Sequence, residues 1–259
     1  MASLIDAIAL GIIQGITEWL PVSSSGHLAI AKEFLDWQPP VLFHIFLHIS
    51  TLLVVLYFFR EDIVQISKAV AKRDFRSEGG RLALFIIIGS LPTAVIGYVF
   101  QDVFKSFFDN LLVVGVALLA TGCLLYFSKQ REGKRSLNHM DSFLIGIAQG
   151  IAIVPGISRS GVTISTGLLR KVDHGAAFRF SFLLSIPATL GAAIAESSDL
   201  TLLADFETSI AVIVGMISGI IVGYLSLQIL RKIILNKKLH WFAIYCWAMG
   251  SLVIIFQIL

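Results

Sequence analysis

The chain carries one polar pattern twice, and each matched position in the second copy lies 135 residues after its partner in the first (141 − 6 = 135). The register continues into the apolar segments that follow the polar pattern. The matched residues are Asp6 and Asp141, Gly11 and Gly146, Gln14 and Gln149, Gly15 and Gly150, Ile16 and Ile151, Ser23 and Ser158, Gly26 and Gly161, Phe43 and Phe178, and Ser50 and Ser185. This duplication predicts two similar halves, 1–128 and 141–259.

The composition excludes a soluble globular protein. Hydrophobic residues make up 56% of the chain, charged residues make up 14%, and the mean hydropathy is +0.86. A helix that crosses a bilayer needs roughly 17–25 predominantly apolar residues. Six stretches meet that requirement: 41–59, 82–100, 111–128, 175–195, 209–230 and 240–258. We therefore predict an all-α, multi-pass integral membrane protein, with 1–259 forming a single membrane domain.

Basic residues are concentrated in alternate connections between these spans. Of the 20 Lys and Arg, 17 lie in the segments 60–81, 129–140, 170–179 and 231–238, whereas the 196–208 connection is acidic. The positive-inside rule places the four basic segments in the cytoplasm. The alternation of six spans then places both termini outside the cytoplasm.

The repeated polar stretches cannot cross the membrane once without reversing this charge pattern. We expect 141–170 to enter from the cytoplasm, turn near Pro155-Gly156 and return to the same side, and we expect 4–31 to do likewise from outside, turning near Pro21. Each half is then a re-entrant helical hairpin followed by three transmembrane helices. Because three is odd, the halves have inverted topology. Non-helical backbone at this depth requires surrounding protein or a water-filled cavity, so the turns predict a cavity.

The first hairpin carries a carboxylate deep in the membrane, where ionisable residues are functional candidates by default. Gln14 and Glu18 are four residues apart and project from one helix face. Ser24, Ser25, Gly26 and His27 follow a few residues later. Two plainer interpretations remain open: Glu18 reaches water from the helix end, and Ser24 only caps a helix.

Histidines offer two further candidates. His27 is the only histidine in the first hairpin, and we favour it over Ser24 as the essential group. His44 and His48 are four residues apart in a predicted span, and they either bind a metal or face the cavity.

The second hairpin places an arginine at membrane depth. Arg159 needs a counter-charge or an anionic ligand there, and its planar guanidinium suits phosphate oxygens. The helix that begins after Pro155-Gly156 also offers free N–H groups to an anion. The alternative is a structural ion pair between Arg159 and Glu18. The neighbouring small residues, which let an anion approach the backbone closely, are Ser158, Ser160, Gly161 and Thr163.

Glycines spaced by four residues give helices smooth faces for close packing. Gly215, Gly219 and Gly223 form such a stripe on one span. We interpret it as internal packing, with dimerisation through the same stripe as the alternative.

Three motifs together resemble the undecaprenyl-pyrophosphate phosphatase family, the bacitracin-resistance proteins. The resemblance covers the whole chain, including its length, its span count and its duplicated halves. The motifs are Gln14-xxx-Glu18, Pro21-Val22-Ser23-Ser24-Ser25-Gly26-His27 and Pro155-Gly156-Ile157-Ser158-Arg159-Ser160-Gly161-Val162-Thr163.

The resemblance implies an undecaprenyl-diphosphate phosphatase, an enzyme that hydrolyses undecaprenyl pyrophosphate to undecaprenyl phosphate and phosphate. This reaction recycles the lipid carrier for peptidoglycan and cell-wall synthesis and confers bacitracin resistance. The resemblance also implies a polyprenyl pyrophosphate lipid as substrate and Mg2+ or Ca2+ as cofactor. The expected location is the bacterial inner membrane, with the active-site cavity opening to the outer face. We expect no nucleic-acid partner, and a homodimer remains open.

The resemblance also implies roles for individual residues. Glu18, Ser24, His27 and Arg159 are the implied catalytic residues, and Glu18 with Gln14 is the implied metal site. Gln14 cannot ionise, which departs from a pair of two carboxylates. The nucleophile stays open between His27, Ser24 and water. The implied phosphate-binding residues are Ser25, Gly26, Ser158, Arg159, Ser160, Gly161 and Thr163.

A different class of function also fits the predicted architecture. Secondary transporters and lipid flippases use inverted repeats with broken helices around a central cavity. Fold alone does not fix function. The alternative is therefore a secondary transporter or a polyprenyl-phosphate flippase, and phosphate release in detergent would distinguish it from an enzyme.

Overall fold

The computed structural model describes residues 4–34, 41–108, 110–130, 133–196 and 206–258. The described residues form helices joined by short turns, with one isolated β-bridge between Arg135 and Val172. The first half contains α1 (Leu4–Thr17), α2 (Ser24–Phe34), α3 (Val41–Phe58), α4 (Arg60–Ala71), α5 (Glu78–Val99), α6 (Gln101–Phe107) and α7 (Leu111–Phe127). The second half contains α8 (His139–Ile151), α9 (Arg159–Leu169), α10 (His174–Glu196), α11 (Phe206–Leu235) and α12 (Phe242–Ile258), and the short 3-10 helices η1 (Ser128–Gln130) and η3 (Leu239–Trp241) precede α8 and α12.

Each of the six predicted spans coincides with a helix, namely α3, α5, α7, α10, α11 and α12. Within the described residues, α5, α10, α11 and the segment Leu239–Ile258 are long and apolar enough to cross a membrane alone. The count rises to six when α3 is taken with α4, which is bent by 76° from it, and α7 with α6, which is bent by 101°. The all-α membrane fold expected from the sequence is confirmed.

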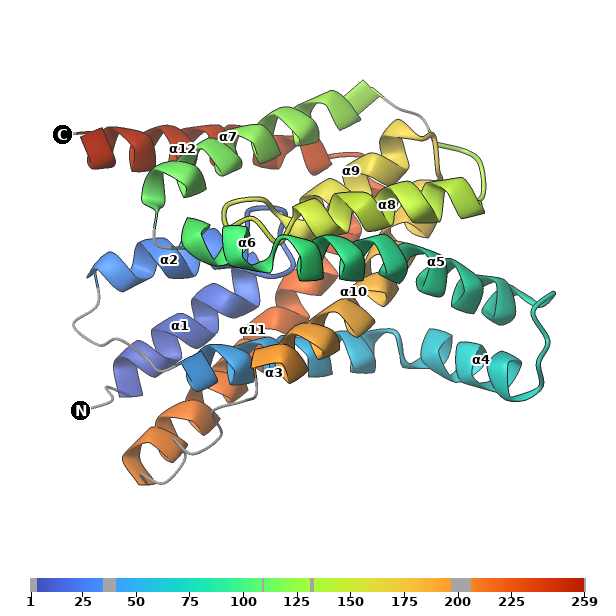
Figure 1. Ribbon diagram of the computed structural model, residues 1–259, viewed down its shortest axis with the longest axis horizontal. Coiled ribbons are helices and arrows are strands. Elements are labelled where there is room, and N and C mark those ends of the chain that lie inside the picture. The colour runs from blue at the N-terminus through green and yellow to red at the C-terminus, as the bar shows by residue number, and fades with distance from the viewer. Residues whose placement is uncertain (1–3, 35–40, 109, 131–132, 197–205, 259) are drawn as a thin grey trace.

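The two polar stretches form helical hairpins that open toward opposite ends of the molecule (Figure 1). The hairpin of α1 and α2 opens toward the end that holds both termini, and the hairpin of α8 and α9 opens toward the other end. The second helices of the two hairpins begin and end at repeat-related residues, since Ser24–Phe34 and Arg159–Leu169 differ by the same offset of 135 (159 − 24 = 135). The inverted arrangement of the halves is thus visible in the backbone.

Each hairpin packs against a long helix of the opposite half. Helix α1 lies along α11, and α8 lies along α5. Glycines allow the backbones to touch: a Cβ atom built on Gly146 would lie 2.1 Å from the carbonyl oxygen of Gly89, and one on Gly11 would lie 2.3 Å from that of Gly215. The halves are therefore interlocked rather than side by side.

The same packing corrects one alternative from the sequence. Gly215, Gly219 and Gly223 lie against α1 and α3, where built Cβ atoms would meet backbone or side-chain atoms of those helices and of Trp19 in the first turn. The stripe is therefore internal packing, because α1 already occupies it, and it offers no surface for a dimer.

Ion pairs hold together the open end of the second hairpin. Asp141, in the first turn of α8, is fully buried and accepts hydrogen bonds from Arg135 at 2.6 and 2.7 Å and from Arg170 at 3.0 Å. Asn138 caps α8 through a capping box with Asp141. Since Arg170 directly follows α9, this cluster joins the beginning of one hairpin helix to the end of the other.

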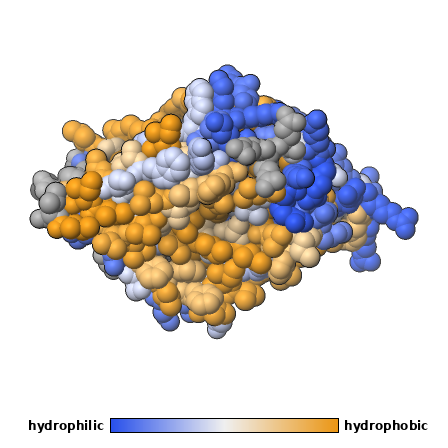
Figure 2. All heavy atoms as spheres, turned by 90° about the horizontal axis from the view of Figure 1, so that it is seen from above, coloured by the Kyte–Doolittle hydropathy of each residue, from blue (hydrophilic) through white to orange (hydrophobic). Residues whose placement is uncertain are grey.

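The surface is apolar over most of the view in Figure 2, and hydrophilic residues gather at one end. That end contains the connection between α4 and α5 (Figure 1), which is rich in basic residues. Large apolar side chains are exposed on the long helices, including Tyr98 (77%), Ile194 (73%) and Ile217 (52%). An apolar surface of this extent requires a nonpolar environment, which a bilayer provides.

Candidate active site

The two hairpin turns meet inside the protein. Ser23 has a backbone φ of +70°, and Gly156 in the other turn has a φ of +93°. The Oγ atom of Ser23 accepts hydrogen bonds from the backbone N–H of Gly156 at 3.1 Å and from that of Gly26 at 3.3 Å. Positive φ is uncommon for serine, so this cross-turn contact accounts for the conformation that Ser23 adopts.

The second turn is fixed by its own hydroxyl groups. Ser158 Oγ accepts from the N–H of Gly161 at 3.1 Å and so caps α9. Thr121 on α7 donates to the carbonyl oxygen of Gly156 and accepts from the N–H of Ser158. These contacts set the direction in which α9 begins, and therefore the position of its first residue, Arg159.

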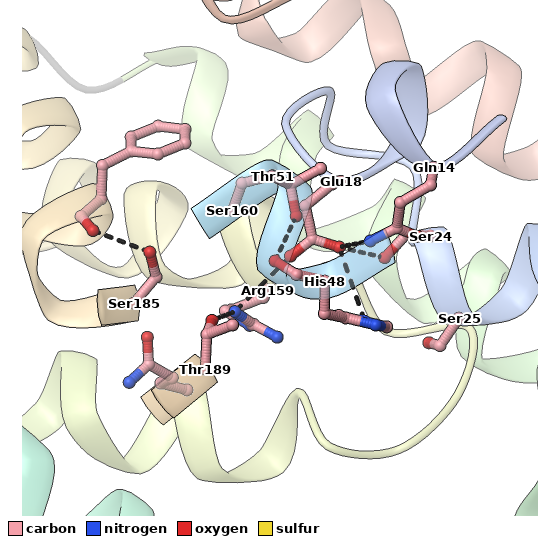
Figure 3. Close-up of polar contacts among 12 residues, drawn as sticks. Gln14, Glu18, Ser24, Ser25, His48, Thr51, Arg159, Ser160, Ser185 and Thr189 are labelled. Carbon is pink, nitrogen blue, oxygen red and sulfur yellow. Dashed lines mark hydrogen bonds and ion pairs between the residues drawn. The ribbon is translucent and has the colours of Figure 1, made fainter. Parts of the chain in front are cut away.

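Glu18 is the centre of the polar contacts where the turns meet (Figure 3). It is 8% exposed. Its Oε2 atom accepts hydrogen bonds from Ser24 Oγ at 2.6 Å and from Gln14 Nε2 at 3.0 Å. Its Oε1 atom lies 3.5 Å from Nη1 of Arg159. The structure thus brings four of the site residues from the sequence motifs together, and they come from both hairpins.

Arg159 is held from a second direction by α10. Its Nη1 atom donates to Thr189 Oγ1 at 2.8 Å, and 29% of the side chain is exposed. Among the described residues this Nη1 atom makes all the side-chain polar contacts of Arg159, so Nε and Nη2 are available to a ligand. A guanidinium with two further donor groups suits an oxyanion.

A small, partly open cavity adjoins Glu18 and Arg159. It combines the carboxylate and the guanidinium with several hydroxyl groups and two aromatic rings. The lining residues are Glu18, Trp19, Arg159, Ser160, Thr163, Ser181, Phe182 and Ser185. This composition suits a charged, oxygen-rich group that enters beside an apolar wall.

The remaining phosphate-binding candidates shape the turns. Ser160 and Thr163 line the cavity, and Thr163 Oγ1 donates to the carbonyl oxygen of Arg159 at 2.8 Å. Ser25 Oγ lies 3.3 Å from Ser23 Oγ, and a Cβ atom on Gly26 would lie 3.1 Å from Gly156. Gly161 packs close to Pro21 and donates its N–H to the Ser158 cap.

The structure places the imidazole of His27 away from this cluster. Its Nδ1 atom lies 2.8 Å from the carbonyl oxygen of Ser23, and its Nε2 atom lies 2.7 Å from the hydroxyl of Tyr245 on α12. The two rings are stacked at 5.7 Å between centroids. His48 instead lies beside the carboxylate, with Nε2 4.0 Å from Glu18 Oε2. The structure thus brings one member of the His44 and His48 pair to Glu18.

The sequence motifs missed the contribution of α10. Ser181, Ser185 and Thr189 follow one another at intervals of four residues, which places them on one face of a helix. That spacing of hydroxyl residues within an otherwise apolar span was the available signal. Their part in the site depends on how α10 packs against α3 and α9, which the local pattern does not specify.

The residues at the site fit a divalent cation only in part. Glu18 offers a carboxylate, and Gln14 Oε1 is buried without a hydrogen-bond partner among the described residues. The described part of the chain contains no group of three or more His, Cys, Asp or Glu that could hold a metal ion. Mg2+ is commonly held by one or two carboxylates together with substrate phosphates, and the donor set fits that mode of binding.

The comparisons with known proteins agree with the motifs. A sequence model of the family described as "Bacitracin resistance protein BacA" matches residues 7–252. An undecaprenyl-diphosphatase from Alkaliphilus metalliredigens is 41% identical over 98% of this chain and 98% of its own length. One from Syntrophotalea carbinolica is 42% identical over 96% and 97%, and one from Methanosphaera stadtmanae is 37% identical over 100% and 99%. The family resemblance is therefore confirmed.

Proposed function

The chain belongs to the bacitracin resistance protein BacA family, and we propose that it hydrolyses undecaprenyl pyrophosphate to undecaprenyl phosphate and inorganic phosphate. Its relatives named undecaprenyl-diphosphatase match nearly the full chain. The observation that carries the proposal is the convergence of Ser24 and Arg159 on the carboxylate of Glu18, which lines the cavity together with Arg159. A nucleophile, a base and an anion-binding group are thereby within reach of one substrate.

The geometry favours Ser24 as the attacking group, although the sequence alone favoured His27. Ser24 Oγ donates a hydrogen bond to Glu18 Oε2 at 2.6 Å, the arrangement of a nucleophile with its general base. The oxygen of Ser24 forms a bond to the terminal phosphorus while the bond from that phosphorus to the bridging oxygen breaks. The Ser24 proton passes to Glu18, undecaprenyl phosphate leaves, and water then cleaves the phosphoserine.

Arg159 holds the phosphoryl group during this transfer. Its Nε and Nη2 donors bind equatorial phosphoryl oxygens, and Thr189 fixes the guanidinium by accepting from Nη1. Arg159 Nη1 also lies 3.5 Å from Glu18 Oε1, so the guanidinium is held beside the proposed general base. The ion pair that the sequence offered as a structural alternative therefore lies between two residues that both line the cavity.

A divalent cation, Mg2+ or Ca2+, fits the proposal as a cofactor. Glu18 and Gln14 Oε1 would hold it through oxygen atoms, with substrate phosphates as further ligands. When bound, it would neutralise charge on the pyrophosphate group.

The location of the site follows from the substrate. A polyprenyl tail remains in the bilayer while its pyrophosphate reaches the cavity, so the partners are the lipid substrate and the membrane, and no nucleic acid. We place the protein in the bacterial inner membrane, with both termini outside the cytoplasm and the cavity open to the outer face. The basic segments at one end of the molecule support this orientation. A homodimer remains a prediction, with the glycine stripe excluded as its surface.

Single-cysteine labelling tests the orientation in a background that lacks Cys123 and Cys246. Reagents applied from outside should label positions 34–38 and 199–205, which apart from residue 34 lie outside the described residues, and positions 131–136, of which 133–136 are described, should be labelled only after the membrane is opened. Labelling of 170–174 from outside would contradict the re-entrant path of the second hairpin.

Phosphate release in detergent tests the activity itself. The purified protein should release inorganic phosphate from undecaprenyl pyrophosphate in micelles, where no second compartment exists. A protein that binds the lipid but releases no phosphate would support the transporter or flippase alternative. No contact among the described residues favours that alternative now.

A further inference from the structure

The cavity-facing side of α10 carries three hydroxyl groups in three different situations. Ser181, Ser185 and Thr189 are spaced by four residues and share one helix face. Ser181 and Ser185 line the cavity, and Thr189 contacts Arg159. A hydroxyl that already has a hydrogen-bond partner within the protein is structural, whereas one without a partner is available to a ligand.

Ser185 has a hydrogen bond inside its own helix. Its Oγ atom donates to the carbonyl oxygen of Phe182 at 2.7 Å. The repeat-related Ser50 does the same to Leu47 at 2.7 Å, and it is not among the residues that line the cavity. Because both halves use this serine in the same way, we assign Ser185 to the helix rather than to a ligand.

Ser181 has no such partner. It is 4% exposed, and its Oγ atom makes no hydrogen bond among the described residues. A buried hydroxyl without a partner is unfavourable. Its repeat-related position holds Phe46, so the hydroxyl is not a shared feature of the two halves. Ser181 therefore carries an unused donor that only the second half supplies, on the wall of the cavity.

The other hydrogen-bonding groups on the cavity wall are already engaged or point elsewhere. Ser160 Oγ lies 3.3 Å from Ser158 Oγ, and Thr163 donates to the carbonyl oxygen of Arg159. Trp19 Nε1 also lacks a partner, but it lies beside Gly223, where a built Cβ atom would be 3.1 Å away, and so faces α11. Among the described lining residues, Ser181 is the one whose hydroxyl group has no hydrogen-bond partner.

We propose that the Ser181 hydroxyl donates a hydrogen bond to a phosphoryl oxygen of the substrate's pyrophosphate group, alongside Arg159. This inference rests on the proposed function and adds a substrate-binding residue outside the two hairpin motifs. Ser181 makes no contact with Ser24 or Glu18 and takes no part in proton transfer. Its contribution is to bind and orient the pyrophosphate.

The test compares Ser181→Ala with Ser165→Ala. Ser165 on α9 is a matched control, since its hydroxyl is also buried and unpartnered but does not line the cavity. In micelles, kcat/KM for a prenyl pyrophosphate should fall by about tenfold or more in Ser181→Ala, because a hydrogen bond to a charged group is lost. Ser181→Thr retains the hydroxyl and should recover most of the loss, and Ser165→Ala should remain near wild type.

Inorganic pyrophosphate provides a second readout that does not depend on turnover of the variant. Its dissociation constant, measured by direct binding to the purified protein, should rise in Ser181→Ala and stay unchanged in Ser165→Ala. An active wild type with unchanged kcat/KM in Ser181→Ala would overturn the inference, as would equal losses in the two alanine variants. A wild type that releases no phosphate would instead contradict the proposed function, and pyrophosphate binding by the two variants would still test Ser181.

Discussion

Ser24 is the first residue of α2 and Arg159 is the first residue of α9, and the two positions are equivalent in the repeat. One hairpin therefore presents a hydroxyl and the other presents a guanidinium, at equivalent positions of two hairpins with similar backbones. Both side chains contact the Glu18 carboxylate, whose own repeat-related position holds Ile153. The duplicated backbone brings two helix beginnings together, and the differences between the copies supply the chemistry.

The residues that stayed the same in the two hairpins have structural tasks. Ser23 and Ser158 each accept a hydrogen bond from the N–H group three residues later. Gln14 and Gln149 are both buried, and each donates a hydrogen bond through Nε2. The acceptor is Glu18 for Gln14 and the carbonyl oxygen of Leu184 for Gln149. The shared serines at 23 and 158 build the turns, and the divergent residues Glu18, Ser24 and Arg159 supply the groups of the proposed mechanism. This division can be tested by changing one member of each class.

The largest effect is expected at Ser24. Ser24→Ala removes the proposed nucleophile and should lower turnover by at least about 10³-fold, since no phosphoserine can form. The equivalent position in the other hairpin is the binding group Arg159, whose change should be milder. Acid-quench trapping with a phosphorus-labelled substrate measures the difference directly, because phosphoserine is stable in acid.

The opposite outcome of that trapping experiment is equally informative. An acid-labile adduct on His27 would return the nucleophile to the residue that the sequence favoured. Oxygen-18 incorporation from water with inversion at phosphorus would indicate direct attack by water, with Glu18 as its base.

The next effect is expected at Arg159. Arg159→Lys keeps the charge but loses the planar set of donors, so turnover should drop at least tenfold, or about 1.4 kcal/mol in activation free energy. Arg170→Lys is the matched control, because Arg170 also pairs with a buried carboxylate but lies at the far end of the hairpin. If Arg159→Lys and Arg170→Lys have the same kcat, the Arg159 contact with Glu18 is only structural.

A third comparison concerns the glycines that both hairpins share. Gly11→Ala and Gly146→Ala each place a Cβ atom within 2.3 Å of a backbone oxygen or a side chain on the facing helix. Each should lower the free energy of unfolding by about 1–3 kcal/mol, the usual cost of overpacking. Thermal denaturation in detergent measures this change.

Gly191→Ala is the control for the shared glycines. A built Cβ atom on Gly191 meets nothing within 4 Å, so alanine should be neutral or slightly stabilising in α10. A marked loss of stability in only one of Gly11→Ala and Gly146→Ala would show that the hairpins are not packed equivalently.

The sequence predicted the architecture well because its signals are physical and local. Span lengths, basic connections and the repeat register placed six helices and two hairpins correctly. The pairing of Glu18 with Arg159 was offered only as the alternative to an anionic ligand, since each charge is costly at membrane depth unless it is paired or ligated. These predictions needed only the properties of individual segments.

The sequence was less informative where a side chain depends on a distant helix. Thr189 supports Arg159 across 30 positions of sequence, and His27 contacts Tyr245 across 218. The local spacing of residues does not specify which face of α10 or α12 packs toward the turns. His27 was therefore grouped with Glu18 on the basis of a shared hairpin, whereas its ring is directed toward α12.

The smallest effect is expected at Tyr245, and it separates the two histidine interpretations. If Ser23 C=O accepts from Nδ1–H, the Nε2 atom of His27 is the acceptor for the Tyr245 hydroxyl, and His27 holds the first turn in place. Tyr245→Phe then removes one neutral hydrogen bond and should lower kcat/KM by only about two- to tenfold. The pH dependence of kcat should keep its wild-type shape, because the base is Glu18. A changed pH profile in Tyr245→Phe would instead indicate that His27 titrates during turnover, and the first hairpin would then supply the base through His27 rather than through Glu18.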